Sequence, residues 1–166
     1  MEEYKTIEGF INYEVSNYGN VRNIKTKRVL KPNLEKGGYQ YVNLYMNKII
    51  TLKKNHRLVA ETFLDNPQDK KCVDHIDNNK LNNHLINLRY ATISENNQNS
   101  TISSRNTSGH KGISFHKGNN KWCARITIDG IQINLGYFEN KEDAINIRIS
   151  KANQLFGNYT NACEKI

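Results

Sequence analysis

The chain contains 166 residues, of which 37% are hydrophobic, and its mean hydropathy is −0.76. Since a chain of this size and composition buries only small cores, we expect two or three small modules rather than one large domain. The 24 Lys and Arg residues outnumber the 16 Asp and Glu residues, which gives a formal net charge of +8 and a pI of about 9.4. This excess favours a polyanionic partner, and solubility alone is the other explanation of a basic composition.

The cysteines and the start of the chain exclude several classes of protein. Cys72, Cys123 and Cys163 lie far apart and form no C-x-x-C pair, so the sequence indicates neither a zinc ribbon nor a disulfide framework. The first residues lack the basic and apolar regions of a signal peptide, and no apolar run is long enough to span a bilayer. We therefore expect a reduced, intracellular protein that is neither secreted nor embedded in a membrane.

Residues 1–52 are predicted to form an N-terminal antiparallel β module. Between Glu14 and Leu52, short β-prone segments alternate with turn residues. The segment 39–46 presents mainly tyrosine on one face and mainly aliphatic residues on the other. We expect both of these faces to pack against protein rather than to stack on bases. Three basic residues around the neighbouring strands are candidate phosphate contacts: Arg22, Lys25 and Lys27.

A helix over residues 56–63 is predicted to open the second segment of the chain, residues 53–99. Asn55 is in position to cap the first turn of this helix, because asparagine side chains accept hydrogen bonds from exposed backbone N–H groups. The dipeptide Asn66-Pro67 marks its end, since proline cannot continue a helix.

A strand, loop, strand and helix unit follows this helix. Strand-like segments at 73–76 and 87–91 flank an Asn-rich stretch, which predicts a β pair with a long connecting loop. Thr92 and Glu95 form a capping box, so a second helix is predicted to begin there, with Asn96 in its second turn. The unit is thus expected to bring a carboxylate on a strand close to an amide on a helix.

The polar residues of this unit have the chemistry of a phosphodiester-cleaving metal site. Asp74 and Asn96 supply a carboxylate and a neutral amide oxygen, which suits one Mg²⁺ or Mn²⁺ ion that keeps waters and takes a further ligand from a phosphate. His75 can accept a proton from the attacking water, since imidazole titrates near neutral pH. Asn87 can hydrogen-bond across the strands and fix the loop. Each residue has an ordinary structural explanation when taken singly, and the ordered set is the specific signal.

Residues 100–109 are small and polar and are predicted to be a linker. Three strands are expected beyond it: 112–116, 121–128 and 131–138. Asp129-Gly130 is a strong hairpin signal between the last two strands. An amphipathic helix follows and ends at Gly157. Residues 110–166 are thus predicted to form a three-stranded sheet packed on one helix.

Strand alternation divides the residues of this C-terminal sheet between two faces. The aliphatic and aromatic residues, among them Trp122 and Ile126, are expected to face the helix. The opposite, open face carries hydrogen-bonding groups, which suits a sheet laid into a DNA major groove as well as an ordinary solvated face. The candidate DNA contacts of this module are Ser114, His116, Lys121, Arg125, Thr127, Gln132 and Asn134.

Four runs of the sequence carry a family resemblance: His56 to Ala60, Val73 to Asn79, Asn87 to Thr92, and Glu95 to Asn99. These runs resemble the HNH endonucleases of the ββα-metal class, in particular the homing enzymes encoded in phage and viral introns. The resemblance implies that Asp74 and Asn96 are the metal ligands. It also implies that His75 is the general base and Asn87 the loop-fixing asparagine. Two arginines within these runs are further candidate DNA contacts: Arg57 and Arg89.

Two flanking regions extend the resemblance over most of the chain. The stretch from Tyr4 to Arg22 looks like the N-terminal β module common in intron-encoded HNH enzymes. The stretches Ser108 to Phe115, Lys121 to Ile126 and Leu135 to Phe138 are similar to the Apetala/ethylene-response type of DNA-binding domain. Because that family reads the major groove with its sheet, the resemblance agrees with the open face deduced above.

The sequence therefore predicts an α+β chain with an N-terminal antiparallel β module, a central ββα-metal HNH unit and a C-terminal three-stranded sheet packed on one helix. The resemblance implies metal-dependent, sequence-preferring hydrolysis of double-stranded DNA to 5′-phosphate and 3′-hydroxyl ends, in the host cytoplasm or nucleoid. A monomer with one catalytic centre nicks one strand, and paired nicks by a dimer are the alternative. A DNA-binding regulator without cleavage is the alternative of another class, and an RNA-binding protein is disfavoured because RNA-module signatures are missing.

Overall fold

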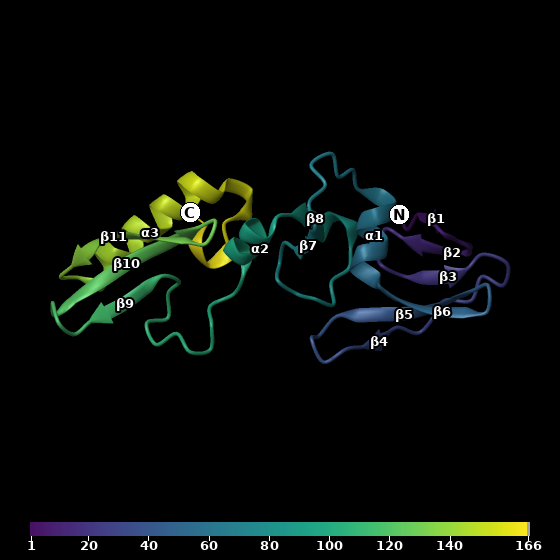
Figure 1. Cartoon of the computed structure of the whole chain (residues 1–166), viewed down its shortest axis with the longest axis horizontal. Coiled ribbons are helices and arrows are strands. Elements are labelled where there is room, and N and C mark those ends of the chain that lie inside the picture. Colours follow the sequence, from purple (N-terminus) through teal and green to yellow (C-terminus); the bar gives the residue numbers. More distant parts are fainter. Residues whose placement is uncertain (166) are drawn as a thin grey trace. The chain divides into compact units, whose positions relative to one another are not determined.

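The structure, a computed structural model, describes residues 1–165 and combines small antiparallel sheets with helices (Figure 1). This architecture confirms the predicted α+β class. Contacts divide the chain into two compact units, Met1–Thr92 and a second unit from Ile93 onward. The four segments predicted from the sequence are divided by their expected roles. The boundaries of those segments remain a prediction. Within the described range, no helix is both long enough and apolar enough to cross a membrane.

Two three-stranded antiparallel sheets form the N-terminal part of the first unit. The first sheet contains, in spatial order, β1 (Tyr4–Ile7), β2 (Phe10–Ser16) and β3 (Val21–Asn23). The second contains β4 (Asn33–Leu34), β5 (Gln40–Met46) and β6 (Ile49–Lys54). Asn47 and Lys48 both have positive φ, 51° and 64°, as a tight two-residue hairpin between β5 and β6 requires.

Helix α1 (Asn55–Phe63) connects these sheets to a separate β pair. It contacts β1, β2, β5 and β6 of the two sheets. It also contacts the two strands of the pair, β7 (Cys72–His75) and β8 (Leu88–Ala91). A short 3-10 helix (Leu85–Asn87) precedes β8. The prediction that Asn55 caps this helix was wrong, because Lys54 is the N-cap and Asn55 lies in the first turn. Its buried side-chain Nδ2 instead donates to the carbonyl oxygen of Gly19, 3.0 Å away.

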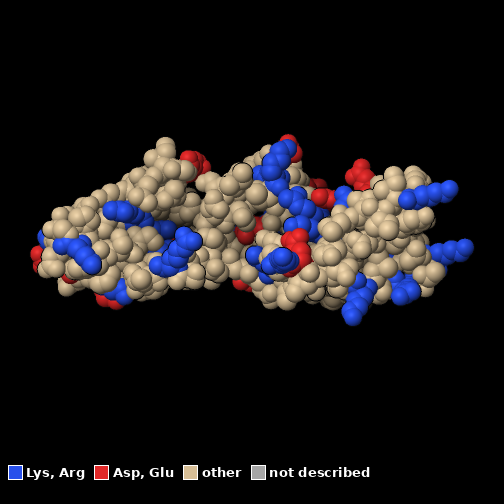
Figure 2. Space-filling view, turned by 60° about the horizontal axis from the view of Figure 1, so that its bottom comes forward, with Lys and Arg blue, Asp and Glu red and all other residues tan. Residues whose placement is uncertain are grey.

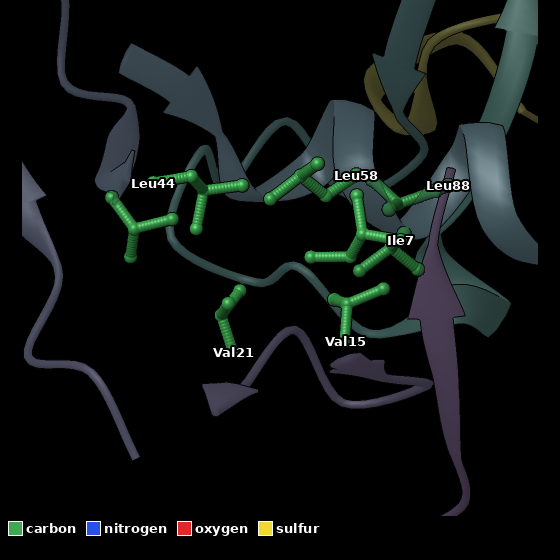
Figure 3. Packing of buried hydrophobic residues seen from close by; sticks show 8 residues of the cluster. Ile7, Val15, Val21, Leu44, Leu58 and Leu88 are labelled. Atoms are coloured by element: carbon green, nitrogen blue, oxygen red, sulfur yellow. The ribbon is translucent and has the colours of Figure 1, made fainter. Parts of the chain in front are cut away.

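One hydrophobic core holds the first unit together (Figure 3). Its buried residues come from both sheets, from α1 and from β8: Ile7, Val15, Val21, Val42, Leu44, Leu58, Val59 and Leu88. The labelled side chains in Figure 3 gather around a common centre, and Leu44 there is 0% exposed. Burying one side chain of this size contributes about 1.5–3 kcal/mol. The N-terminal sheets and the β7–β8 pair are therefore stabilised by the same core.

The outer face of the second sheet is exposed. Val42 and Leu44 of β5 point into the core, whereas Tyr45, on the opposite face of the strand, is 54% exposed. Ile50, which pairs with Tyr45, is 68% exposed, and the neighbouring Leu52 is 52% exposed. The prediction that both faces of this tyrosine-rich segment pack was wrong for its second half, where Asn43 and Tyr45 are exposed, whereas Tyr39 and Tyr41 are half-buried.

The second unit is built on the predicted C-terminal sheet. Its elements are α2 (Ile93–Asn99), β9 (Ile113–His116), β10 (Lys121–Ile128), β11 (Ile131–Phe138), α3 (Lys141–Phe156) and the short 3-10 helices Gly157–Tyr159 and Ala162–Glu164. The strands lie in the order β11-β10-β9, all antiparallel, and α3 covers one face (Figure 1). Asp129 and Gly130 have positive φ, 48° and 81°, and Gly157 ends α3. The expected strands, hairpin and helix end are thus confirmed.

Helix α2 is bonded to this sheet. Gln98 Nε2 donates to the carbonyl oxygen of Thr127, 2.8 Å away, on the part of β10 that extends beyond the pairing with β9. Lys111 Nζ donates to the carbonyl oxygens of Gln98 and Ser100, at 2.6 and 2.8 Å, and so satisfies the C-terminal end of the helix. The carboxylate of Glu164 lies 3.9 Å from the same ammonium group. The helix that carries Asn96 is therefore part of the second unit.

We expect Leu44→Ala to lower the free energy of unfolding by about 2–5 kcal/mol, because it leaves a cavity in the core of the first unit. Leu52→Ala, on the neighbouring exposed strand position, should change it by about 0.5 kcal/mol or less. Urea denaturation measures both variants. Amide hydrogen exchange in β7 and β8 should also become faster in Leu44→Ala, and unchanged exchange there would show that the N-terminal sheets fold separately from the β7–β8 pair.

Candidate active site

Asp74 and His75 end strand β7, and both side chains are buried, with residue exposures of 5% each. Antiparallel pairing puts Asp74 opposite Arg89 of β8. Arg89 Nε donates to Asp74 Oδ2 at 2.8 Å, and Nη2 lies 2.7 Å from the same oxygen. The guanidinium therefore pairs with the buried carboxylate through two of its nitrogens. Arg89 was also predicted to contact DNA. The ion pair with Asp74 does not test that contact, which stays a prediction.

Asn87 fixes the loop between β7 and β8 with three hydrogen bonds. Its Nδ2 donates to Asp77 Oδ1 and to the carbonyl oxygen of Asn82, each at 2.8 Å. Its Oδ1 accepts from the backbone N–H of Asp77 at 3.0 Å. These bonds join the two ends of the loop, which is the geometry expected of a loop-fixing asparagine. Asn82 Nδ2 donates a further hydrogen bond of 2.7 Å to Asp77 Oδ2. The Asp77 carboxylate therefore accepts hydrogen bonds from two asparagines of this segment.

The imidazole of His75 lies in a buried polar and aromatic environment. Its Nε2 is 3.2 Å from Oδ1 of Asn83, and its ring centroid is 5.0 Å from that of His56 and 6.0 Å from that of Tyr39. Burial lowers the pKa of His75 below its ordinary 6.5, although the Asn83 hydrogen bond and nearby carboxylates oppose that shift. A neutral imidazole at neutral pH is the form that accepts a proton.

His56, beside His75, is a buried residue that the sequence did not single out as functional. It is 4% exposed in the first turn of α1, and burial, aided by the His75 charge, lowers its pKa to about 3. The Tyr39 ring lies 4.9 Å from it, and the ammonium groups of Lys54 and Lys80 lie 4.8 and 4.7 Å from the Tyr39 ring centre. No local pattern predicts this cluster, because its members come from β6, α1, β7 and two loops. Only the presence of His56 in a family-like run points to it.

Asn96 lies on α2, in the second unit, whereas Asp74, His75 and Asn87 lie in the first. That Asn96 and Asp74 bind one ion therefore stays a prediction. The donor chemistry fits a hard divalent cation, since both side chains offer oxygen ligands. Among residues 1–165 no group of three or more His, Cys, Asp and Glu side chains is arranged to hold a metal ion. An ion bound by so few protein ligands would keep positions for water and phosphate.

The predicted basic contacts of the first unit differ in accessibility. Arg22 Nε lies 2.5 Å from Glu14 Oε1, and its side chain is only 26% exposed. Lys27 pairs with the same carboxylate at 3.1 Å and stays 59% exposed. Lys25 and Arg57 are exposed. Lysine and arginine side chains are present on both units on the face drawn in Figure 2, which is consistent with the excess positive charge of the chain.

The open face of the C-terminal sheet has the composition that strand alternation predicted. Strand register places these polar residues on the face opposite α3: Ser114, His116, Lys121, Arg125, Thr127, Gln132 and Asn134. All of them are exposed or half-buried. A pocket of about 530 Å³ adjoins this face, and Arg125, Thr127 and Gln132 contribute to its lining together with residues of α2. The face therefore offers donors and acceptors that a ligand can reach.

Two family models match the chain. The NUMOD4 motif matches residues 2–45, and the HNH endonuclease model matches residues 53–98. The first range covers β1 to β4 and nearly all of β5, and it ends before β6. The second contains Asp74, His75, Asn87 and Asn96.

Curated relatives carry related descriptions. The uncharacterized HNH endonuclease L247 of Acanthamoeba polyphaga mimivirus is 50% identical over 93 residues, which cover 54% of this chain and 23% of that protein. The DNA endonuclease I-HmuI of Bacillus phage SP01 is 40% identical over 91 residues, or 54% of this chain and 52% of that protein. The H-N-H endonuclease F-TflII of Escherichia phage T5 is 35% identical over 114 residues, or 66% of this chain and 58% of that protein. The chain thus spans less than two thirds of each of these relatives.

A solved structure described as "DNA binding and cleavage by the HNH homing endonuclease I-HmuI" resembles the fold. It superposes with a TM-score of 0.57 at 33% sequence identity, and the match covers 80% of this chain and 76% of that chain.

We expect the stability of the first unit to depend on pH through His56. Its pKa is about 3 in the folded protein against an ordinary value of 6.5, so the unfolded state binds the extra proton first. Stability is then fully present above about pH 6.5 and is lost as the pH falls toward 3. His56→Phe should reduce this slope by up to about 1.4 kcal/mol per pH unit. Urea denaturation at several pH values tests this, and Leu58→Val, a neutral change on α1, should shift the curve without changing its slope.

Proposed function

The chain belongs to the HNH endonuclease family, and we propose that it is a metal-dependent DNA endonuclease that prefers certain sequences and nicks one strand. The observation that carries this proposal is the buried Asp74 and His75 pair at the end of β7, beside a loop that Asn87 fixes. The chain offers in one place a hard oxygen ligand and a neutral imidazole, which are the groups that phosphodiester hydrolysis requires.

In the proposed reaction, Asp74 and Asn96 would hold one Mg²⁺ or Mn²⁺ ion through their side-chain oxygens. When bound, such an ion stabilises the negative charge that develops on the phosphate and on the leaving 3′ oxygen. His75 accepts the proton of the attacking water, and Arg89 orients the Asp74 carboxylate. Asn87 holds the loop that follows His75. The products are a 5′-phosphate and a 3′-hydroxyl.

The proposed partner is double-stranded DNA, bound by a monomer inside the cell. The net charge of +8 supports a polyanionic ligand. The open face of β9, β10 and β11 is proposed to enter the major groove, in the manner of an Apetala/ethylene-response type of domain, with Arg125 meeting base edges or phosphate. Lys25, Lys27 and Arg57 of the first unit are proposed to contact the backbone. The similarity to the I-HmuI structure, which is described as one of DNA binding and cleavage, supports this choice of partner.

We expect purified protein with Mg²⁺ to convert supercoiled plasmid to the nicked form, and EDTA to prevent it. His75→Ala should lower the rate by about 10²- to 10⁴-fold, the range for loss of a general base, while DNA binding in mobility-shift assays is kept. His110→Ala, a histidine outside the site, should keep the native rate. A shift in mobility without nicked product under any condition would instead identify a DNA-binding regulator, and sequencing ends made on a random-site library would define the preferred target.

We expect the affinity for DNA to fall with salt, with log K decreasing by about 0.9 per log unit of salt for each phosphate neutralised. Arg125→Ala should cost about 1–3 kcal/mol of binding free energy if the side chain reads a base, or lower the salt slope by about 1 if it contacts a phosphate. Lys151→Ala, on α3 and so on the other side of the sheet, is the charge-matched control and should change neither quantity. A flat salt dependence of the native protein would contradict the proposed DNA surface.

A further inference from the structure

A chain of side-chain hydrogen bonds connects His75 to the N-terminal sheets. Oδ1 of Asn83 lies 3.2 Å from Nε2 of His75, and Nδ2 of the same asparagine donates to Oε1 of Gln40 at 2.8 Å. Gln40 is the first residue of β5, in the part of the chain that matches the NUMOD4 motif. The histidine and the asparagine lie in the part that matches the HNH endonuclease model.

Asn83 is held in place by the N-terminal sheets. It is 3% exposed, and a Cβ added to Gly19, whose φ is 87°, would lie 2.6 Å from its Cβ. Only glycine fits there, because this close approach coincides with a backbone conformation that other residues rarely adopt. Two residues further on, the backbone N–H of Leu85 donates to the carbonyl oxygen of Asn17 at 2.8 Å. The turn between β2 and β3 thus fixes the segment that carries Asn83.

The amide orientations at Asn83 and Gln40 favour one tautomer of His75. Asn83 Nδ2 donates to Gln40 Oε1, and Asn83 Oδ1 faces Nε2 of the ring. An amide oxygen can only accept, so this arrangement is satisfied when Nε2 carries the proton and Nδ1 carries the lone pair.

We propose that Asn83 and Gln40 are positioning residues that hold His75 in the Nε2-protonated tautomer, so that Nδ1 receives the proton of the attacking water. This proposal rests on the proposed function for the role of His75, but the tautomer itself is a property of the protein without DNA or metal. It gives the N-terminal module a part in the chemistry in addition to any contact with DNA. Asn83 connects Gln40 of β5 to His75 at the end of β7 through its two amide atoms.

The tautomer can be read directly by NMR on protein labelled with ¹⁵N in its five histidines. Long-range ¹H–¹⁵N spectra distinguish the protonated ring nitrogen from the unprotonated one, and the spectrum of His75→Gln assigns the signals of His75. In the native protein we expect Nδ1 to resonate as the unprotonated nitrogen. In Asn83→Ala both nitrogens should move toward intermediate shifts, because the acceptor is removed. Asn83→Asp retains an acceptor oxygen, and at a pH where the ring is neutral it should keep Nε2 as the protonated nitrogen.

Gln40→Ala tests whether the influence reaches back to the N-terminal sheet. It should move the His75 ring signals in the same direction as Asn83→Ala, by a smaller amount. Its matched control is Asn43→Ala, an exposed change on the same strand, which should leave them as in the native protein. Gln40→Ala also keeps the test decisive if Asn83→Ala does not fold.

Cleavage assays add a second readout. Asn83→Ala should lower kcat about tenfold with little change in KM, since the ring is misoriented but still present, and Asn83→Asp should recover most of that loss. A native protein with Nε2 unprotonated, or an Asn83→Ala variant with native ring signals, would overturn the proposal. If NMR shows the Nε2-protonated tautomer but the protein does not cut DNA in any assay, the proposed function is contradicted. The proposed role of Asn83 and Gln40 in setting the tautomer would then still stand.

Discussion

The packing of both N-terminal sheets, α1 and β8 around one core is the constraint on which the first unit depends. A sheet of two or three short strands is marginal by itself, so neither N-terminal sheet nor the β7–β8 pair has enough apolar surface to be stable alone. Leu58 and Val59 of α1 and Leu88 of β8 supply that surface. As a consequence, the strand end that bears Asp74 and His75 shares its core with residues of β1, β2, β3 and β5, which precede it by thirty or more positions in the sequence. The rigidity of the candidate site comes from this shared core.

Much of the architecture was predictable from local patterns. The hairpin at Asp129-Gly130, the strands around it and the end of α3 at Gly157 follow from turn chemistry and periodicity, which operate over a few residues. The features that were predicted wrongly depend on distant partners. Asn55 is not a cap because Gly19 offers it a buried acceptor. The tyrosine-rich face of β5 is half-buried at Tyr41 and exposed at Tyr45, a difference that the alternation of residues along one strand does not reveal.

In the candidate site, too, some residues could be selected from local sequence and others depend on distant partners. Asp74, His75 and Asn87 were selected by their order and chemistry, and the structure buries all three and gives Asn87 its loop-fixing bonds. Arg89 was selected as a DNA contact, which stays a prediction, and strand register also makes it the partner of Asp74, which no one-dimensional pattern reveals. His56, Asn83 and Gln40 could not be predicted for the same reason, because they meet only through tertiary structure.

The bonding of α2 has a consequence for how such chains exchange parts during evolution. A crossover within the polar stretch 100–109 would join a foreign sheet to this helix and abolish the bonds from Lys111 to Gln98 and from Gln98 to Thr127. A crossover between Thr92 and Ile93 would preserve them, because the helix would travel with its own sheet. Recombinants that transfer a new C-terminal sheet together with its helix should therefore also transfer Asn96. One parent would then contribute Asp74 and the other Asn96.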